Sequence, residues 1–420
     1  MSQKVSEVPQ YEGKKIALRG WIYRHRAGKS VVFIVLRDST GTVQCTVKGE
    51  EYEKAEPLLI ESAVEIEGTV KVDERAPGGY EVVVEKLTVV HAAERFPITK
   101  DQSKEFLRDV RHLWLRSQPM AATLKIRSTV FGAIDDFFRT RKYYEFQSPI
   151  FTKTAGEGGS TLFEVEYFGK KAFLAQTWQL YAEAAIFALE KIYTIAPSFR
   201  AEKSSTSRHL TEFWHAEMEV AWMGFDDLQA EAEALVSFIV ERVLERHQAE
   251  LKILGVDVAA LEKVKPPFPR MTYKEALAKL KEAGMDVPYG KDLRTKEEKL
   301  LCEMYDKPVI VTHYPKEIKA FYMKESPGDT VLGMDMLVPH VGEIIGGSER
   351  ETKIEELEKR LAEEGETIED YGFYMDTRKY GSVQHSGFGL GIDRVVQWIC
   401  GLDSIHEAIG FPRTMDRISP

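Results

Sequence analysis

The stretch PSFRAEKSSTSRHLTEFWHAEMEVAW, residues 197–222, decides the fold of the larger part of this chain. It reads as a strand ending at Arg200, a polar loop, and a returning strand that carries Glu217 and Glu219, so we predict an antiparallel hairpin. Alternate side chains of a strand share one face, so the charged groups converge there. The planar donor fork of arginine suits phosphate oxygens, and Arg200 and Arg208 would form a nucleotide cradle. A salt-bridged hairpin without a ligand is the alternative for this segment taken alone.

Two further segments place glycine and charged residues beside predicted strands. In GEIIGGSER, residues 342–350, Glu343 and Arg350 flank a Gly-Gly pair that lets a backbone approach a ligand closely. In HSGFGLGIDRVVQWICG, residues 385–401, glycines precede Arg394 on the first turn of an apolar helix, an arrangement that suits a phosphate or an adenine. Each segment alone is weak evidence. Together with the hairpin, and in this order, they predict a nucleotide site.

The chain divides into two parts with different periodicity. Between residues 15 and 90, five short runs rich in β-branched residues alternate with turn residues, which predicts a five-stranded OB-fold β-barrel. Farther along, strand and helix patterns alternate, which predicts an α+β domain built on an antiparallel sheet flanked by helices. We therefore expect an OB-fold domain at 1–92, a linker at 93–118 and a catalytic domain at 119–420.

Several individual elements of the second domain follow from the pattern. Residues 226–246 have apolar side chains at helical steps behind an acidic cap, which predicts an amphipathic packing helix. The stretches EVEYFGKKAFLA (164–175) and IKAFYM (318–323) read as strands. The charged run RETKIEELEKRLAEEG (350–365) is typical of a solvated surface helix.

Composition limits the class of protein. With 420 residues, 43% of them hydrophobic, the chain can bury a large core in two or more domains. Cys45, Cys302 and Cys400 are too few and too scattered for a disulfide framework or a zinc site. The polar opening residues and the lack of a long apolar stretch lead us to expect a cytoplasmic protein with no membrane segment. The net charge of −10 does not suggest a nucleic-acid binder, although local basic and stacking surfaces can still hold RNA.

These segments resemble the signature motifs of class II aminoacyl-tRNA synthetases, specifically the aspartyl, asparaginyl and lysyl subgroup with an N-terminal anticodon-binding barrel. YYEFQSPIF (143–151) is similar to motif 1, FRAEKSSTSRHLTEFW (199–214) to motif 2 and GFGLGIDR (387–394) to motif 3. The likeness covers nearly the whole chain. It implies an antiparallel catalytic sheet and a homodimer formed through motif 1 around Pro149.

The resemblance also implies the roles of individual residues. Arg200 would bridge the substrate carboxylate and the α-phosphate of ATP, with Arg394 and Glu343 as further catalytic residues. The ATP site would comprise Arg200, Glu202, Arg208, His209, Leu210, Glu343, Gly391, Ile392, Asp393 and Arg394. The amino-acid site would comprise Glu157, Gln179, Glu217 and Arg350, and Mg²⁺ would bind Glu343 and Asp335. The chain departs from the family at Trp178, where a small residue is usual.

The choice of amino acid depends on Glu217. HAEMEVAW, GEIIGGSER and RKYGSVQHSGFGLG resemble the asparaginyl branch, which implies that ATP activates L-asparagine for transfer to tRNA-Asn. Carboxamide and carboxylate are nearly isosteric, so a pocket separates them by hydrogen-bond polarity and charge. The resemblance implies that Glu217 accepts from the substrate NH2 group and that Arg350 donates to the amide oxygen. Aspartate would place two carboxylates together.

In the barrel, the resemblance implies that Phe33 stacks on an anticodon uridine and that Gln44 hydrogen-bonds to it. Three other functions stay open at this point. One is an aspartyl enzyme that charges both tRNAs, and another is a relative that makes asparagine from aspartate, ATP and ammonia. The third is a non-catalytic RNA-binding descendant. The barrel argues against the second, and Arg200, Glu343 and Arg394 argue against the third.

Overall fold

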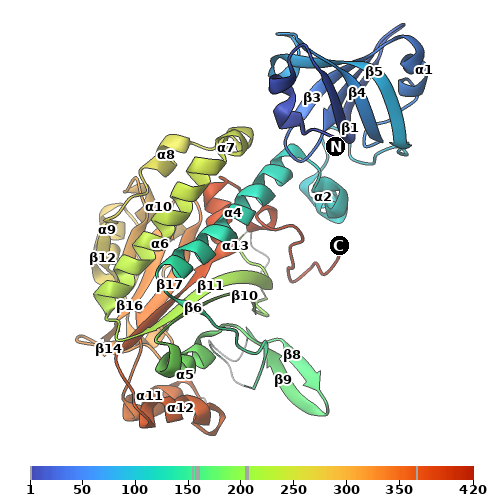
Figure 1. The fold of residues 1–420 in the computed structure, drawn as a ribbon. Helices are drawn as coiled ribbons and strands as arrows, with labels where there is room; N and C mark the ends of the chain where they lie inside the picture. Colours follow the sequence, from blue (N-terminus) through green and yellow to red (C-terminus); the bar gives the residue numbers. More distant parts are fainter. Residues whose placement is uncertain (1, 154–155, 157–160, 204–207, 366–367) are drawn as a thin grey trace. The chain divides into compact units, whose positions relative to one another are not determined.

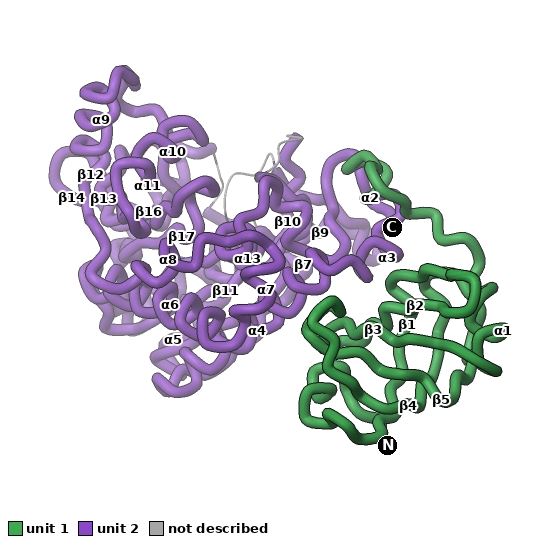
Figure 2. The backbone as a smooth tube through the Cα atoms, turned by 90° about the horizontal axis from the view of Figure 1, so that it is seen from above, with its two compact units in different colours: residues 1–107 green, residues 108–420 purple. Residues whose placement is uncertain are grey.

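A computed structural model describes residues 2–153, 156, 161–203, 208–365 and 368–420 (Figure 1). The chain forms two compact units, residues 1–107 and 108–420 (Figure 2). Within the described residues, no helix combines the length and the apolar composition that crossing a membrane requires.

The first unit is a closed five-stranded barrel, as predicted. Its strands follow the order β1-β2-β3-β5-β4, and every neighbouring pair is antiparallel except β3 and β5. Along β2, Val32, Ile34 and Leu36 are fully buried, whereas Phe33 is half-buried on the outer face. The strands are β1 (Lys15–Ala27), β2 (Val32–Arg37), β3 (Thr42–Val47), β4 (Ala63–Val72) and β5 (Tyr80–His91).

The second unit is built on an eight-stranded sheet of order β12-β13-β16-β17-β18-β11-β10-β6. Its five inner pairs are antiparallel, and only the edge strands β12 and β6 run parallel to their neighbours. The predicted α+β fold is therefore confirmed. The strands are β6 (Tyr144–Glu145), β10 (Lys191–Phe199), β11 (Glu212–Ala221), β12 (Arg270–Thr272), β13 (Val309–Thr312), β16 (Gly333–Val338), β17 (Gly342–Glu349) and β18 (His385–Gly391).

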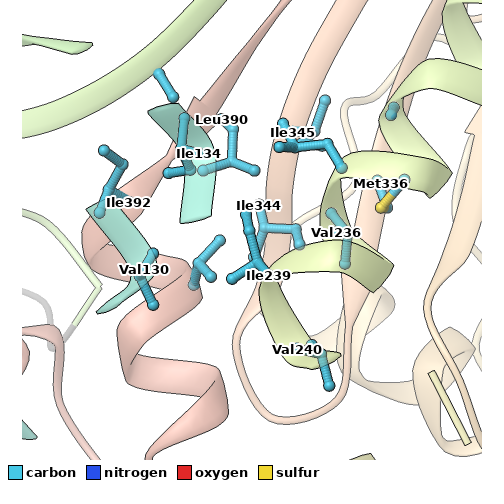
Figure 3. Close-up of a cluster of buried hydrophobic side chains, with 14 of the residues drawn as sticks. Val130, Ile134, Val236, Ile239, Val240, Met336, Ile344, Ile345, Leu390 and Ile392 are labelled. Carbon is cyan, nitrogen blue, oxygen red and sulfur yellow. The ribbon is translucent and has the colours of Figure 1, made fainter. Parts of the chain in front are cut away.

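One face of this sheet carries the main hydrophobic core. The helices α4 (Gln118–Thr140), α6 (Phe225–Arg246) and α13 (Ile392–Ile399) pack on it. Each fully buried aliphatic side chain contributes about 1.5–3 kcal/mol, so this layer fixes the sheet beneath the site. The prediction of an amphipathic helix over 226–246 is confirmed. Figure 3 labels Val130, Ile134, Val236, Ile239, Val240, Met336, Ile344, Ile345, Leu390 and Ile392.

Shorter elements surround the two main layers. The short strands are β7 (Phe151–Thr152), β8 (Glu164–Tyr167), β9 (Lys170–Leu174), β14 (Glu325–Ser326) and β15 (Thr330–Val331). The remaining helices are α1 (Tyr52–Ala55), α2 (Lys104–Asp109), α3 (Arg111–Trp114), α5 (Gln179–Leu189), α7 (Gln248–Leu254), α8 (Val258–Glu262), α9 (Tyr273–Glu282), α10 (Thr295–Glu303), α11 (Ile354–Glu364) and α12 (Gly372–Lys379).

Three element predictions need correction. Residues 164–175 form the hairpin β8–β9 rather than one strand, because Phe168 and Gly169 adopt positive φ and reverse the chain. Residues 318–323 form no strand. They lie in turns, and Phe321 and Tyr322 are buried there among aromatic side chains. The helix within 350–365 is present but not solvated all round, since two of its leucines are fully buried.

We predict that Gly387→Ala destabilises the second unit by about 1–3 kcal/mol. A Cβ atom at this position of β18 would overlap the Glu219 carboxylate and the carbonyl of Met218. The control is Gly132→Ala on the exposed side of α4, where a Cβ meets nothing within 4 Å and should stabilise the helix by up to about 1 kcal/mol. Thermal unfolding followed by circular dichroism measures both, and equal melting temperatures would contradict the overlap.

Candidate active site

The three segments singled out in the sequence occupy adjacent strands at the centre of the sheet. β10 and β11 form the predicted hairpin, β18 pairs with β11, and β17 pairs with β18. The register places Glu217 opposite Gly389, Gly389 opposite Gly346, and Gly346 opposite Asp335. Directly opposite residues project to the same face of a sheet. Two carboxylates therefore stand on one face with two glycines between them, which leaves a floor on which a ligand can lie.

A pocket opens at one end of this floor. Nine of the ten residues predicted for the ATP site line it, and the exception is Ile392, whose side chain lies in the hydrophobic core. Its lining residues are Arg200, Glu202, Arg208, His209, Leu210, Phe213, His215, Glu343, Ile344, Gly389, Gly391, Asp393, Arg394 and Ile405.

The positive charge of this pocket is held in place by neighbouring groups. Arg394, on the first turn of α13, donates to the Glu343 carbonyl oxygen at 2.8 Å. Arg208 donates to Thr295 Oγ1 at 2.5 Å and to Glu298 Oε2 at 2.6 Å, both on α10. The guanidinium of Arg200 lies 5.5 Å from the centroid of the Phe213 ring. These contacts come from three separate elements, β17, α10 and β11, so the arginines are oriented by the fold itself.

His209 and Asp393 have different surroundings within the same pocket. Burial lowers the pKa of His209, assisted by the charges of Arg394 and Arg208 and opposed by Glu202. Its ring is therefore neutral at pH 7. Asp393 accepts hydrogen bonds from Arg127 Nη1 at 2.5 Å and from the Trp214 backbone N–H at 2.7 Å. Asp393 thus links α13 to β11 through a hydrogen bond and forms part of the pocket wall.

A second pocket continues from the first on the same face. The predicted amino-acid residues Gln179, Glu217 and Arg350 line it, whereas Glu157 lies outside the described residues. Trp178 does not line it: the indole is buried in a separate apolar cluster and donates to the Phe146 carbonyl at 2.8 Å. The departure from the family pattern at Trp178 therefore does not change the side chains that line this pocket, and neighbouring residues form its wall.

Glu217 is a buried carboxylate prepared to accept hydrogen bonds. It accepts from Thr177 Oγ1 at 2.5 Å and from the Trp178 backbone N–H at 3.0 Å, with His215 Nδ1 3.6 Å away. Burial alone would raise its pKa, but the contact with His215 and the hydrogen bonds outweigh burial and lower the pKa. Glu217 is therefore ionised at neutral pH.

Arg350 is anchored by an ion pair in the pocket wall. Its Nε and Nη2 atoms donate to the two carboxylate oxygens of Glu219 at 3.0 and 2.9 Å, and Nη1 donates to Ser348 Oγ at 2.8 Å. Arg350 and Glu219 are 3% and 1% exposed, so their charges balance each other inside the protein. Only the remaining N–H groups of Arg350 are available to a ligand.

Glu343 and Asp335 form the best candidate for a divalent-metal site. A Cβ atom on Gly346 would lie 3.2 Å from Glu343 Oε1 and 3.7 Å from Asp335 Oδ1, so both carboxylates face the space above this glycine. Oxygen pairs of this kind suit a hard cation. Asp335 also accepts from Lys319 Nζ at 2.7 Å. Burial, opposed by Lys319 and reinforced by Glu343, raises the pKa of Asp335 to about 6.

A second acidic cluster has metal-like spacing but no unbalanced charge. Ligand atoms of Glu183, Glu219 and His385 lie within 4.8 Å of one another. Arg350 pairs with Glu219, and Arg378 Nη2 donates to Glu183 at 2.5 Å. Since the two carboxylates are already neutralised by two arginines, we assign this cluster to the supporting wall.

The barrel residues predicted to contact an anticodon share the outer face of the first unit. Phe33 lies opposite Thr46, and Gln44 lies opposite Val35, on the paired strands β2 and β3. The Arg26 guanidinium lies 4.9 Å from the centroid of the Phe33 ring, and Gln44 Nε2 donates to Glu81 at 3.4 Å. An aromatic ring, a cation and an amide therefore stand together on one surface.

Sequence reasoning missed several residues that line these pockets. The strand period of β11 carried a usable signal, because Phe213 and His215 alternate with Glu217 and share its face. Lys319 and Ile405 carried none, since Lys319 stands in a bend and Ile405 begins a three-residue 3-10 helix, and only the tertiary fold brings them to the site.

Comparison with known proteins gives consistent results over the whole chain. A family model described as tRNA synthetases class II (D, K and N) matches residues 103–415, and one for an OB-fold nucleic acid binding domain matches residues 16–90. The asparagine–tRNA ligase of Thermoplasma acidophilum is 49% identical over 98% of this chain and 97% of its own. That of Pyrococcus furiosus is 49% identical over 100% of both chains.

Solved structures show the same likeness. The asparaginyl-tRNA synthetase of Pyrococcus horikoshii complexed with asparaginyl-adenylate superposes with a TM-score of 0.96 at 47% identity, covering 100% of both chains. The aspartyl tRNA synthetase of Entamoeba histolytica reaches a TM-score of 0.87 at 25% identity, covering 100% of this chain and 93% of its own.

We predict that Arg350→Met lowers the free energy of unfolding by about 3–5 kcal/mol, because it leaves Glu219 buried without its counter-charge. Removing both charges in Arg350→Met/Glu219→Met should restore part of this loss. Urea unfolding followed by fluorescence measures the difference. A double variant no more stable than the single one would show that the ion pair is not the source of the loss.

Proposed function

This chain belongs to the class II tRNA synthetases of the D, K and N group, and from that premise we propose that it joins L-asparagine to tRNA-Asn using ATP. Asparaginyl-adenylate and pyrophosphate form first, and the asparaginyl group then passes to the 3′ end of the tRNA with release of AMP. One observation carries the proposal: the two pockets share Arg200, His215, Glu343 and Gly389. A substrate carboxylate and an α-phosphate can therefore meet beside one arginine.

Arg200 at this junction holds the asparagine carboxylate and an oxygen of the α-phosphate. Arg394 and Arg208 carry positive charge along the nucleotide pocket, and Phe213 and Ile405 offer apolar surface to a purine ring. The carboxylate attacks the α-phosphorus in line, so no side chain has to take a proton in this step. The protein contributes position and charge neutralisation.

We propose that Mg²⁺ accompanies ATP and is held by Glu343 and Asp335. Both carboxylates border the space over Gly346, and their hard oxygen atoms match this ion. When bound, the ion would neutralise charge on the phosphates. Lys319, which lines the amino-acid pocket, donates to Asp335 and so holds this carboxylate in place.

Selection of asparagine rests on Glu217. This carboxylate is ionised and lines the amino-acid pocket, so it accepts from the NH2 group of a carboxamide and repels a carboxylate. Arg350 does not cancel this repulsion, because Glu219 already balances its charge. A pocket with this wall favours asparagine over aspartate.

The alternatives receive less support. Relatives at 44–50% identity over nearly the full length are asparagine–tRNA ligases, whereas the aspartyl structure of Entamoeba histolytica is 25% identical. A relative that makes asparagine from ammonia has no use for an anticodon-binding barrel. The closed barrel at 15–91 supports a tRNA substrate.

We further propose how the parts act together. Residues 1–92 would read the anticodon with Phe33 and Gln44, residues 93–118 would link the domains, and residues 119–420 would catalyse the reaction in the cytoplasm, where tRNA is charged. A homodimer would form around Pro149. Supporting this, Tyr144, Ile150 and Phe151 are 60%, 43% and 50% exposed, an apolar surface that a second copy would cover.

The direct test is charging of purified tRNA-Asn and tRNA-Asp with asparagine and with aspartate, in four separate reactions with ATP and Mg²⁺. We expect product only from asparagine with tRNA-Asn. Aspartate attached to either tRNA would move the protein to the aspartyl branch, and no charging by a folded protein would refute the synthetase activity.

Arg200→Ala should reduce asparagine-dependent ATP–pyrophosphate exchange by about 100- to 1000-fold, because the carboxylate and the α-phosphate lose their shared donor. Its melting temperature should stay close to that of the parent. Arg242→Ala, on the outer side of α6 beside Glu245, serves as a control with normal exchange. Near-normal exchange by Arg200→Ala would remove Arg200 from the mechanism.

Glu217→Gln should weaken the rejection of aspartate by about tenfold or more, since the repelling charge is gone while the shape of the side chain is kept. The measurement is the ratio of kcat/KM for asparagine and aspartate in pyrophosphate exchange. Glu212→Gln, on the same strand but outside the amino-acid pocket, is the control. An unchanged ratio would place amide recognition elsewhere.

A further inference from the structure

Behind the amino-acid pocket lies a buried carboxylate whose hydrogen-bonding capacity is filled. Glu183 on α5 is 0% exposed. A carboxylate offers about four lone-pair positions, and four separate donors approach this one. They are Gln179 Nε2 at 2.8 Å, the Tyr374 hydroxyl at 2.9–3.0 Å, Arg378 Nη2 at 2.5 Å and His385 Nε2 at 2.9 Å.

The identity of these partners makes Glu183 an obligatory acceptor. Arg378 can only donate, so the Glu183 oxygen that it meets at 2.5 Å must accept, and both side chains are fully buried, which favours the charged pair. Burial alone would raise the pKa of Glu183, but the adjacent Arg378 and His385 lower it. Glu183 therefore carries a negative charge and has no proton to share.

An obligatory acceptor fixes the orientation of the neighbouring amide. Gln179 can meet Glu183 only with its NH2 group, so its carbonyl oxygen must face the other way. Gln179 lines the amino-acid pocket, and no described residue donates to its Oε1 atom. The amino-acid pocket therefore presents a hydrogen-bond acceptor, the Gln179 oxygen, at this position. If the Gln179 amide were flipped by 180°, its NH2 group would present a donor instead.

We propose that Glu183 is a positioning residue that sets the polarity of the Gln179 amide, so that the Gln179 oxygen receives the α-ammonium group of the amino acid. The inference rests on the proposed function, which supplies an amino acid as the ligand. An ammonium group has three donors and no acceptor, so it matches an oxygen and is repelled by an NH2 group. Glu183 touches no substrate itself and acts through Gln179.

The experiment compares asparagine with succinamic acid, which is asparagine without its α-amino group. KM for asparagine and the inhibition constant of succinamic acid are measured in ATP–pyrophosphate exchange for the parent and for Glu183→Gln. A glutamine at 183 can donate to Gln179 Oε1 and let that amide turn over. We expect KM for asparagine to rise about 10- to 100-fold, with the inhibition constant of succinamic acid and KM for ATP changed less than about threefold.

Tyr374→Phe is the matched control, because it removes one donor to Glu183 and leaves Gln179 facing the same carboxylate. It should keep the parent ratio of the two constants. If Glu183→Gln does not fold, Glu183→Gln/Arg378→Met removes the paired charges together and gives the same comparison. Proportional weakening of both ligands, or no weakening of asparagine, would overturn the proposal. Absence of asparagine-dependent exchange in the parent would instead refute the proposed function, and calorimetric binding of the two ligands would still test the role of Glu183.

Discussion

The register between β11, β18, β17 and β16 is the constraint on which the rest of the site depends. It aligns Glu217, Gly389, Gly346 and Asp335 across the sheet. A carboxylate therefore lies at each end of this row, and the two glycines, which have no side chain, leave space between them. A shift of one residue in any of these strands would turn its side chains to the opposite face. The core packed by α4, α6 and α13 beneath the sheet holds that register.

The walls around this floor follow one electrostatic rule: buried charges come with a partner. Arg350 meets Glu219, Arg378 meets Glu183, Asp393 meets Arg127, and Lys319 meets Asp335. Each pair neutralises itself within the protein and leaves the orientation of the remaining donors and acceptors fixed before a ligand arrives. Such preorganised dipoles act strongly in a site from which water is excluded. This is consistent with a reaction whose main demands are position and charge.

Much of this arrangement could be predicted from the residues. The barrel followed from five β-branched runs, and the β10–β11 hairpin followed from the charged loop between two strand patterns, because both signals are local. The aromatic segment 318–323 was misread because its apolar side chains bury in turns, where alternation has no meaning. Lys319 and Glu298 reach the site only through tertiary packing, and nothing in their local sequence marks them, whereas Glu183 follows the predicted site residue Gln179 by one turn of the same helix. Glu157 lies outside the described residues, so its predicted role stays a prediction.

The position of β18 has a consequence for how the chain folds during synthesis. This strand is the last of the sheet to leave the ribosome, yet it lies between β11 and β17, which are made earlier. Until residues 385–391 are available, the edges of β11 and β17 remain without their partner, and exposed edges of this kind invite pairing with other chains. The nucleotide pocket can thus form only when the chain is nearly complete, and we expect a translation product that ends before residue 385 to lack this pocket and to expose two unpaired strand edges.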